Sequence, residues 1–279
     1  MRMASALEYG VKRPKPGTKF AQFRGGGRVW AVAAVHAAAA RLVRLHDVIS
    51  DSFQEGDRLV YLGNYIAYGD AVLETIDELL DFRRRVLGRR HGCSCDVVFL
   101  RGAQEEMWQK LLQLQFAPNP REVLEWTVRA GMEATVRAYG GDLRQGFAAS
   151  RDGPRSITRW TGALRGAMNS APGHTALFSA LRHAAFTVDR GLLFVPAAID
   201  PSRPLAAQGD AFWWGRSDIL DLENSFAGFR RVIRGIDHEQ RGFAEGAFSV
   251  SLDGGTGHPG RLHAGCFNVD GELVKLVEA

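Results

Sequence analysis

The chain has 279 residues, of which 46% are hydrophobic and 24% are charged. This composition is that of a globular protein with a full core, and it excludes a disordered, collagen-like or disulfide-stapled chain. The formal net charge is +4, and residues 1–20, with five basic residues and one acidic residue, account for all of it. The body of the chain is therefore neutral, which argues against a nucleic-acid partner, because a nucleic-acid groove needs a basic surface.

The sequence divides into a basic tail and one domain. We expect residues 1–27 to form a flexible N-terminal tail, able to contact a membrane surface or an acidic partner, and residues 28–279 to form a single domain. The longest apolar run, Val29 to Ala40, is interrupted by His36 and is shorter than the roughly 20 residues of a transmembrane helix. The three cysteines, Cys93, Cys95 and Cys266, are sparse and odd in number. These features predict a cytoplasmic protein without a transmembrane segment.

Short apolar runs alternate with longer amphipathic stretches in the first hundred residues. The runs are rich in Val, Leu and aromatic residues, which predicts buried strands, and the longer stretches have the apolar spacing of helices. The strands are expected over Arg28–Ala33, Arg58–Leu62 and Asp96–Leu100, and the helices over Ala38–Ser50 and Asp70–Arg89. This alternation indicates an α/β architecture.

Helices then dominate the middle of the chain and strands its last third. A helical insert is expected over about residues 105–138, as two helices separated by Pro118-Asn119-Pro120. Residues 139–175 are rich in Gly, Ser and Arg and are predicted to be the least regular part, with helical character at Ile157–Met168. Five strands follow, over 191–195, 231–234, 247–252, 261–268 and 272–278. Asp270-Gly271 predicts that the last two form a hairpin.

The first three predicted strands each end in a short block, and ligands of open α/β sheets bind at such carboxyl ends. The blocks are A-A-V-H-A at 33–37, G-N-Y-I-A-Y-G at 63–69 and G-A-Q-E at 102–105. In order and spacing they resemble the blocks G-D-x-H-G, G-D-x-x-D-R-G and G-N-H-E of calcineurin-like metallophosphoesterases, in the branch of serine/threonine phosphatases and diadenosine tetraphosphatases. Glycines of these blocks and of a later one are kept, at Gly63, Gly69, Gly102 and Gly235.

The resemblance continues downstream. Leu193–Pro201 is similar to the family segment F-V-H-A-G-I-D-P, and Val232–Asp237 resembles the strand that ends in Gly-His or Ala-His. Residues 251–271 resemble the closing strands. The resemblance covers about residues 28–278 and implies a metallophosphoesterase-like fold: two packed mixed β-sheets flanked by helices, with a helical insert.

The same resemblance implies where the metal ligands of the family would lie. Those enzymes use two divalent metal ions, which need carboxylate, imidazole and amide ligands. The six ligand positions fall on Ala34, His36, Asn64, Ala103, Pro196 and Ile236. Only His36 and the neutral amide of Asn64 offer a lone pair. The proton-donating histidine falls on Gln104, the aspartate that orients it on Ala67, and the phosphate-binding arginine on Tyr68.

The substitutions predict a catalytically inactive pseudophosphatase without a metal cofactor, which binds another protein as a regulatory or structural subunit. One alternative is a residual phosphoprotein or dinucleotide hydrolase, with one Mn, Fe or Zn ion held weakly at a remodelled site near His36 and Asn64. Another is a metal-free binder of a phosphorylated ligand, for which Arg101 and Arg234 are the nearby cations. A new site could also be assembled from His36, Asp200 and Asp237–Glu239.

Three residues keep two interpretations each at this stage. His36 is either a residual contact for a ligand or an imidazole left in a polar pocket. Trp213 and Trp214 either form an exposed aromatic anchor for a partner or seal the edge of the core.

Overall fold

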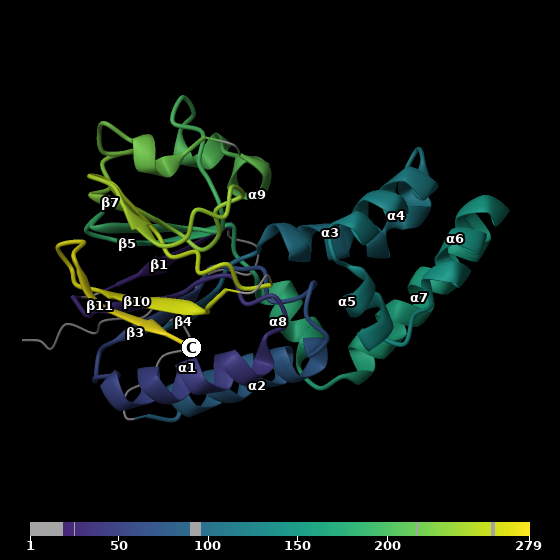
Figure 1. The fold of residues 1–279 in the computed structure, drawn as a ribbon, viewed down its shortest axis with the longest axis horizontal. Helices are drawn as coiled ribbons and strands as arrows, with labels where there is room; N and C mark the ends of the chain where they lie inside the picture. The colour runs from purple at the N-terminus through teal and green to yellow at the C-terminus, as the bar shows by residue number, and fades with distance from the viewer. Residues whose placement is uncertain (1–18, 25, 90–95, 216, 258–259) are drawn as a thin grey trace, which may run out of the picture.

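Two mixed β-sheets pack face to face in the computed structural model, which describes residues 19–24, 26–89, 96–215, 217–257 and 260–279. Two long helices lie against the outer face of one sheet, and a helical arm extends away from both sheets (Figure 1). Residues 1–18 of the predicted tail, and Cys93 and Cys95, lie outside the described residues.

The five-stranded sheet has the order β11-β10-β2-β3-β4. Strands β2 (Val29–Val32), β3 (Arg58–Tyr61) and β4 (Val97–Phe99) are parallel, with Trp30 opposite Leu59 and Leu59 opposite Val97. Strand β10 (His263–Phe267) is antiparallel to both β2 and β11 (Leu273–Glu278). The three early strands and the closing hairpin predicted from the sequence are confirmed.

The six-stranded sheet has the order β1-β5-β6-β7-β9-β8. Its strands are β1 (Phe20–Phe23), β5 (Ala184–Thr187), β6 (Leu192–Val195), β7 (Arg231–Arg234), β8 (Ala244–Glu245) and β9 (Ser249–Ser251). Strand β1 corrects the predicted tail, since Phe20–Phe23 pairs in parallel with β5 instead of preceding the domain. Phe23 is buried and packs edge to face on Phe194, so its apolar side chain fixes this edge strand.

The two faces of β2 show why both sides of this sheet are covered. Val29 and Ala31 point toward the six-stranded sheet and pack in the core between the sheets. Trp30 and Val32 point the other way, into the larger core under the helices. Successive side chains of a strand alternate between faces, so a continuous apolar run requires cover on both.

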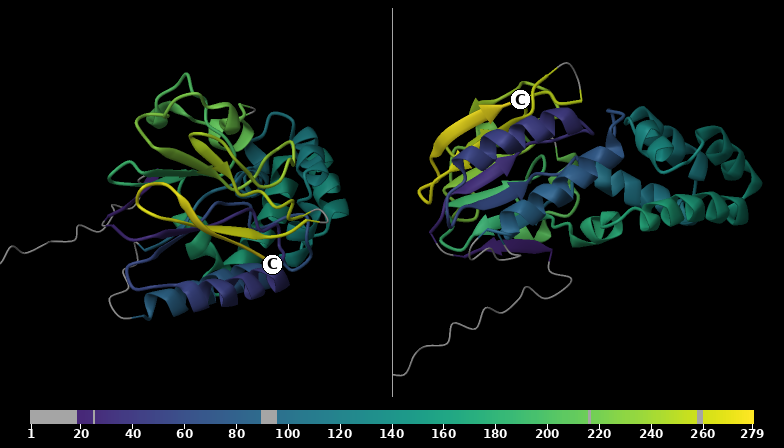
Figure 2. Two further views of the ribbon diagram at one scale, coloured as in Figure 1. Left: turned by 60° about the vertical axis from the view of Figure 1, so that its left-hand side comes forward. Right: turned by 90° about the horizontal axis from the view of Figure 1, so that it is seen from below.

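Helices α1 (Ala39–Ser52) and α2 (Val72–Leu87) lie side by side across the outer face of the five-stranded sheet (Figure 2). His46 of α1 is fully buried between them and stacks on the Phe82 ring at 3.8 Å. Its Nδ1 lies 2.5 Å from Glu78 Oε1, and its Nε2 lies 2.8 Å from the Tyr61 hydroxyl. Burial lowers the pKa of His46 below its ordinary value of 6.5, although the hydrogen bond to Glu78 acts in the opposite direction.

His46 should make the stability of the fold depend on pH. Because its pKa is lower in the folded chain than in the unfolded chain, the unfolded state binds more protons once the pH falls below about 6.5. The contribution of His46 is therefore complete above that pH and is lost as the pH falls. We expect His46→Gln to flatten the decrease in the free energy of unfolding between neutral and mildly acidic pH, measured by urea unfolding. An unchanged slope would contradict this assignment.

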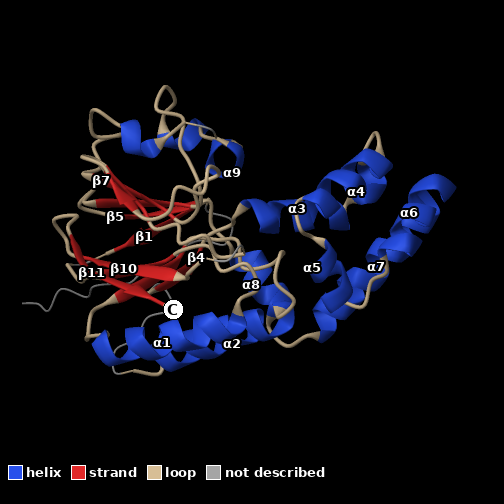
Figure 3. Ribbon diagram, in the orientation of Figure 1, coloured by secondary structure: helices blue, strands red, loops and turns tan. Residues whose placement is uncertain are grey.

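The helical arm is longer than the sequence predicted (Figure 3). The predicted insert, 105–138, is only its first part, since helices continue to residue 180. The arm consists of α3 (Ala103–Leu112), the 3₁₀ turn η1 (Leu114–Phe116), α4 (Pro120–Arg129), α5 (Glu133–Ala138), α6 (Leu143–Asp152) and α7 (Pro154–Ser170). Helix α8 (His174–Ala180) leads back to the sheets and contacts α2, with His174 Nε2 3.1 Å from Asp77 Oδ1. None of the helices in the described ranges combines the length and the apolar character needed to cross a membrane.

Residues 139–175 are mostly helical, so the expectation of irregular structure was wrong there except at Ile157–Met168, whose predicted helical character is confirmed in α7. The Asp142 carboxylate accepts a hydrogen bond from Arg144 N at 2.8 Å and caps α6, while Pro154 starts α7. A Cβ on Gly146 would lie 2.7 Å from the Trp160 ring, so the glycine lets α6 and α7 approach closely. The glycines that suggested a loop are thus partly helix-packing residues.

Candidate functional site

The predicted ligand positions meet where strands of both sheets end. Ala34 N donates to Gly235 O at 3.1 Å, which joins the loop after β2 to the loop after β7. Val35 N and His36 N both donate to Asn64 O, at 3.0 and 2.8 Å, which joins the loops after β2 and β3. Ile236 N donates to Pro196 O at 3.1 Å, and Gln104 N donates to Asn64 Oδ1 at 3.1 Å. Backbone bonds therefore bring the loops that carry all six positions into one place.

Glu105 holds two of these loops together, and the sequence analysis did not include it among the site residues. Its carboxylate accepts hydrogen bonds from Asn64 N and Gly102 N at 2.8 Å each, and from Tyr65 N at 2.7 Å. The side chain is buried, and desolvation raises its pKa even though these bonds favour the charged form. The signal for Glu105 was present in the sequence, since it is the last residue of the block that resembles G-N-H-E.

The loops have a strained backbone. Among the described residues, eight non-glycine residues have a positive φ, and five of them lie in the loops after β2 and β3. These five are His36 (49°), Ala37 (55°), Asn64 (56°), Ala67 (70°) and Tyr68 (61°). Such conformations cost on the order of 1–3 kcal/mol each for residues with a Cβ and persist only where surrounding contacts impose them. Alanine at position 37 has therefore not relaxed the turn in which the family has glycine.

The four retained glycines explain how the loops pack so closely. A Cβ on any of them would lie between 2.4 and 2.7 Å from a neighbouring atom. At Gly102 that atom is Asn64 N, and at Gly63, which has a φ of 91°, it is Gly102 N. At these four positions a side chain would overlap a neighbouring loop, which accounts for the glycines there.

The side chains at the centre of the site are polar but poorly suited to a metal. His36 is 3% exposed and contacts the Tyr68 ring edge to face, with centroids 5.0 Å apart. Asn64 Nδ2 and Gln104 Oε1 are buried, and neither has a hydrogen-bond partner in the described part of the chain. Ala34, Ala103, Pro196 and Ile236 contribute alkyl groups, which have no lone pair for a cation.

The chain therefore does not fit the dinuclear metal centre that the sequence resemblance implies. Two cations need several negatively charged or imidazole ligands within one small volume. Over the described ranges, no group of three or more His, Cys, Asp and Glu side chains is arranged to hold a metal ion. No chemical step through a metal pair follows from these residues.

The loop after β3 also joins the site to the helical arm. Ala67 N donates to Thr135 Oγ1 of α5 at 3.1 Å, and Tyr68 N donates to Gly131 O at 3.1 Å. His36 and Tyr68 line a shallow groove of about 460 Å³ beside the first turns of α1 and α2. Tyr68, at the position of the phosphate-binding arginine, is 42% exposed and presents a phenol ring instead of a guanidinium.

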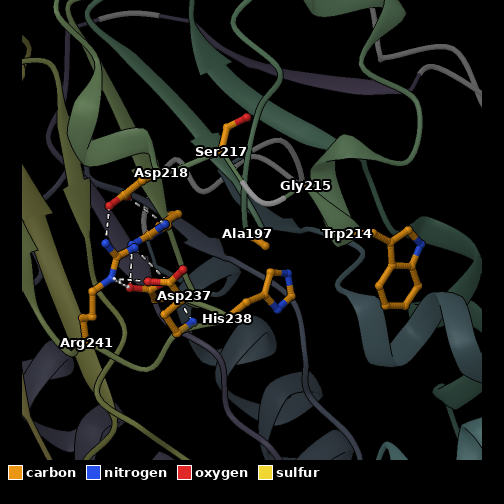
Figure 4. Close-up of a pocket in the computed structure, with 10 residues that line it drawn as sticks. Ala197, Trp214, Gly215, Ser217, Asp218, Asp237, His238 and Arg241 are labelled. Carbon is orange, nitrogen blue, oxygen red and sulfur yellow. Dashed lines mark hydrogen bonds and ion pairs between the residues drawn. The ribbon is translucent and has the colours of Figure 1, made fainter.

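A second pocket of about 440 Å³ lies at the ends of β6 and β7, beside the short helix α9 (Ala211–Trp214) (Figure 4). Its wall contains an ion-pair cluster of Asp218, Arg234, Asp237 and Arg241. Burial raises the pKa of Asp237, but hydrogen bonds from Arg241 and from Glu239 N outweigh it, so the pKa lies below its ordinary value. Burial lowers the pKa of Arg234.

The predicted contact residues divide between surface and interior. Arg234 is 3% exposed and ion-paired, and Arg101 pairs with Glu106 Oε2 at 3.2 Å, so both cations are already engaged within the fold. Trp213 is buried and donates to Arg101 O at 2.6 Å, which makes it a core residue. Trp214 is half-buried and packs on Trp126 of α4, with ring centroids 5.6 Å apart.

The new site predicted from His36, Asp200 and residues 237–239 does not assemble. His36 lines the groove beside α1, whereas Asp237, His238 and Glu239 line the second pocket. Asp200 belongs to a local turn, in which it accepts a hydrogen bond from Ser202 N at 3.0 Å. Nothing in the spacing of Asp218 and Arg241, which are 23 residues apart, predicts that they meet in one cluster.

Comparison with known proteins supports the fold through structure and not through sequence. No family model matches the sequence, and no curated protein matches it. A solved structure assigned as a diadenosine tetraphosphatase is similar to this chain, with a TM-score of 0.54 and 17% identity over 94% of this chain and 97% of the other. The chain has the metallophosphoesterase fold. This confirms the fold class expected from the sequence, with two mixed sheets flanked by helices.

Two further solved structures are less similar to this chain. A serine/threonine phosphatase from Saccharomyces cerevisiae, with similarity to human phosphatase PP5, gives a TM-score of 0.49 and 11% identity over 88% of this chain and 76% of the other. A metallophosphoesterase from Sphaerobacter thermophilus gives a TM-score of 0.41 and 14% identity over 91% and 88%.

Proposed function

We propose that this protein is a pseudophosphatase, which has kept the metallophosphoesterase fold without its catalysis and binds another protein as a regulatory or structural subunit. The observation that carries the proposal is the contrast between backbone and side chains at the strand ends. The loops keep their close packing and their positive φ angles, while four of the six ligand positions hold Ala, Pro or Ile.

The groups that would handle protons and phosphate are replaced as well. Gln104 stands where the family has its proton-donating histidine, and an amide has no proton to give at neutral pH. Ala67 cannot orient such a donor. Tyr68 cannot replace the bidentate guanidinium that holds a phosphate. Each loss alone would slow an enzyme, and their combination leaves no route for hydrolysis of the kind the family uses.

A role in protein binding is supported by large apolar side chains at the surface of the arm. Phe116 of η1 is 79% exposed, and Trp126 of α4 is 36% exposed. Aromatic residues are enriched among the side chains that contribute most to protein interfaces. Trp126 also packs on Trp214, whereas Phe116 leaves most of its surface exposed for a contact with a partner. The protein partner and a cytoplasmic location remain predictions.

Phosphatase assays should show no activity that depends on the site. With manganese and aryl phosphate substrates, we expect the wild type, His36→Ala and Asn64→Ala to give the same background turnover, because the two side chains cannot hold a metal pair. A wild-type turnover clearly above that of both variants would contradict the proposal.

Elemental analysis of the purified protein distinguishes the proposed pseudophosphatase from the alternative, a metal-dependent hydrolase. Stoichiometric Mn, Fe or Zn that is lost in His36→Ala would support a single-metal phosphoesterase built on His36 and Asn64. We expect the protein to contain no stoichiometric metal.

A further inference from the structure

In the wall of the second pocket, at the ends of β6 and β7, Arg234 and Arg241 form ion pairs with carboxylates of the same wall. Arg241 directs all three guanidinium nitrogens at carboxylates, with Nε 2.7 Å from Asp237 Oδ2, Nη2 3.2 Å from Asp237 Oδ1, and Nη1 on Asp218. Arg234 donates from Nε to Ser251 Oγ at 3.0 Å, and its Nη2 lies 2.9 Å from Asp237 Oδ2. Arg234 is also 3% exposed and ion-paired with Asp218 and Asp237, so the charges of both guanidinium groups are compensated by carboxylates within the fold.

One carboxylate of the pocket wall is only weakly paired. Among the lining residues that the structure describes, three carboxylates, Asp218, Asp237 and Glu239, stand against two guanidinium groups, so one carboxylate has no guanidinium of its own. Glu239 carries the least compensated of these charges. Its side chain is 72% exposed, and its contact with Arg241 Nε is a long 3.6 Å. Exposed pairs at such distances contribute little, so this carboxylate can exchange one cation for another.

The opposite side of the pocket is aromatic. Trp214 contributes its indole, which is positioned by the edge-to-face contact with Trp126. The face of an indole attracts cations, and it does so better than the other aromatic rings. His238 lies between the two sides (Figure 4). Its Nε2 is 2.9 Å from Trp213 O, so Nε2 carries the proton and Nδ1 of the neutral ring is an acceptor.

We propose that this pocket binds an arginine side chain of a protein partner. A planar guanidinium can stack on Trp214 and donate hydrogen bonds to Glu239 and to His238 Nδ1, which matches the charge, the aromatic wall and the acceptors. A volume of about 440 Å³ is large enough for a whole side chain. This inference names the chemistry of the partner and rests on the proposed protein-binding function.

Fluorescence anisotropy with a labelled peptide tests this proposal. The probe is a short peptide whose only charged side chain is one central arginine, and its control has citrulline, which keeps the shape and removes the charge. We expect the citrulline peptide to bind at least about tenfold more weakly, since cation–π and carboxylate contacts are both lost. Glu239→Gln and Trp214→Leu should each weaken binding of the arginine peptide by about three- to tenfold.

Glu55→Gln is the matched control. Glu55 is an exposed carboxylate before β3, at the end of the sheet away from the pocket, so its removal should leave binding unchanged. Trp214→Leu can disturb the contact with Trp126, whereas Glu239→Gln changes only a surface charge. Wild-type affinity in Glu239→Gln, or equal binding of the citrulline peptide, would overturn the proposal. Preferred binding of the same peptide with a central glutamate or phosphoserine would overturn it as well.

The peptide-binding test and the phosphatase assay can fail independently of each other. An inactive protein that does not discriminate arginine from citrulline refutes only the arginine pocket. Phosphatase turnover that depends on His36 refutes the pseudophosphatase, whatever the peptide does.

Discussion

Replacing Glu105 by alanine should lower the free energy of unfolding by about 3–5 kcal/mol, because three buried backbone N–H groups would lose their acceptor. The donors, at Asn64, Tyr65 and Gly102, belong to the two loops that follow β3 and β4. The strained φ values of Asn64 and of its neighbours depend on these bonds. Urea unfolding followed by circular dichroism measures the change.

The neighbouring acid provides a matched control. Glu106 is partly exposed and pairs with Arg101 and Lys110, at 3.2 and 3.8 Å. Glu106→Gln should therefore cost no more than about 1 kcal/mol, as for other exposed ion pairs. Glu105→Gln should lower the free energy of unfolding by an amount between those of Glu105→Ala and Glu106→Gln. Its amide keeps one acceptor oxygen, but its N–H groups face backbone donors. Equal stability of Glu105→Ala and Glu106→Gln would show that Glu105 does not hold the loops.

The sequence was sufficient to predict most of the sheet framework and the position of the site. Strands β2, β3 and β4 are short apolar runs buried on both faces, a pattern that few other structures produce. The blocks that follow them are constrained by contact, as at Gly102, where a side chain would overlap Asn64. Residues under such constraints can match a family pattern whatever side chains stand at the ligand positions around them.

Features that depend on distant contacts could not be predicted in the same way. Strand β1 is four residues at a sheet edge, and it is defined by pairing with β5, far along the chain. The cluster of Asp218, Arg234, Asp237 and Arg241 lies in or beside loops, where residue types carry no periodic signal. The glycines of the arm did not distinguish a loop from a helix. Gly146 lets two helices pack closely, although the composition of its segment is typical of a loop.

The proposed pseudophosphatase also explains why apolar side chains can stand at the ligand positions of the strained loops. Clustered carboxylate and imidazole ligands without their cations would be buried, uncompensated polar groups, at several kcal/mol each. Alanine, proline and isoleucine avoid that cost in a metal-free fold. The backbone strain at Ala37, Asn64 and Ala67 remains, however, because it is imposed by contacts between loops and not by the ligands.

Restoring the ligand side chains should therefore restore metal binding. The variant that combines Ala34→Asp, Asn64→Asp, Ala103→Asn, Pro196→His and Ile236→His, with His36 kept, should bind about two manganese ions per chain, as the family does, because its loops already meet at the required place. Without manganese this variant should unfold at a lower temperature than the wild type, since new carboxylates lie beside buried Glu105.

Added manganese should raise the unfolding temperature of this variant again, since a ligand that binds only the folded state stabilises it. Elemental analysis and thermal unfolding with and without manganese measure both effects. The same variant with Asn64 left unchanged is the control, because a neutral amide cannot bridge two cations, and it should show a smaller response to manganese. A folded variant that takes up no manganese would show that the loops have lost more than their side chains, and that the backbone seen at the strand ends is not the one a metal pair requires.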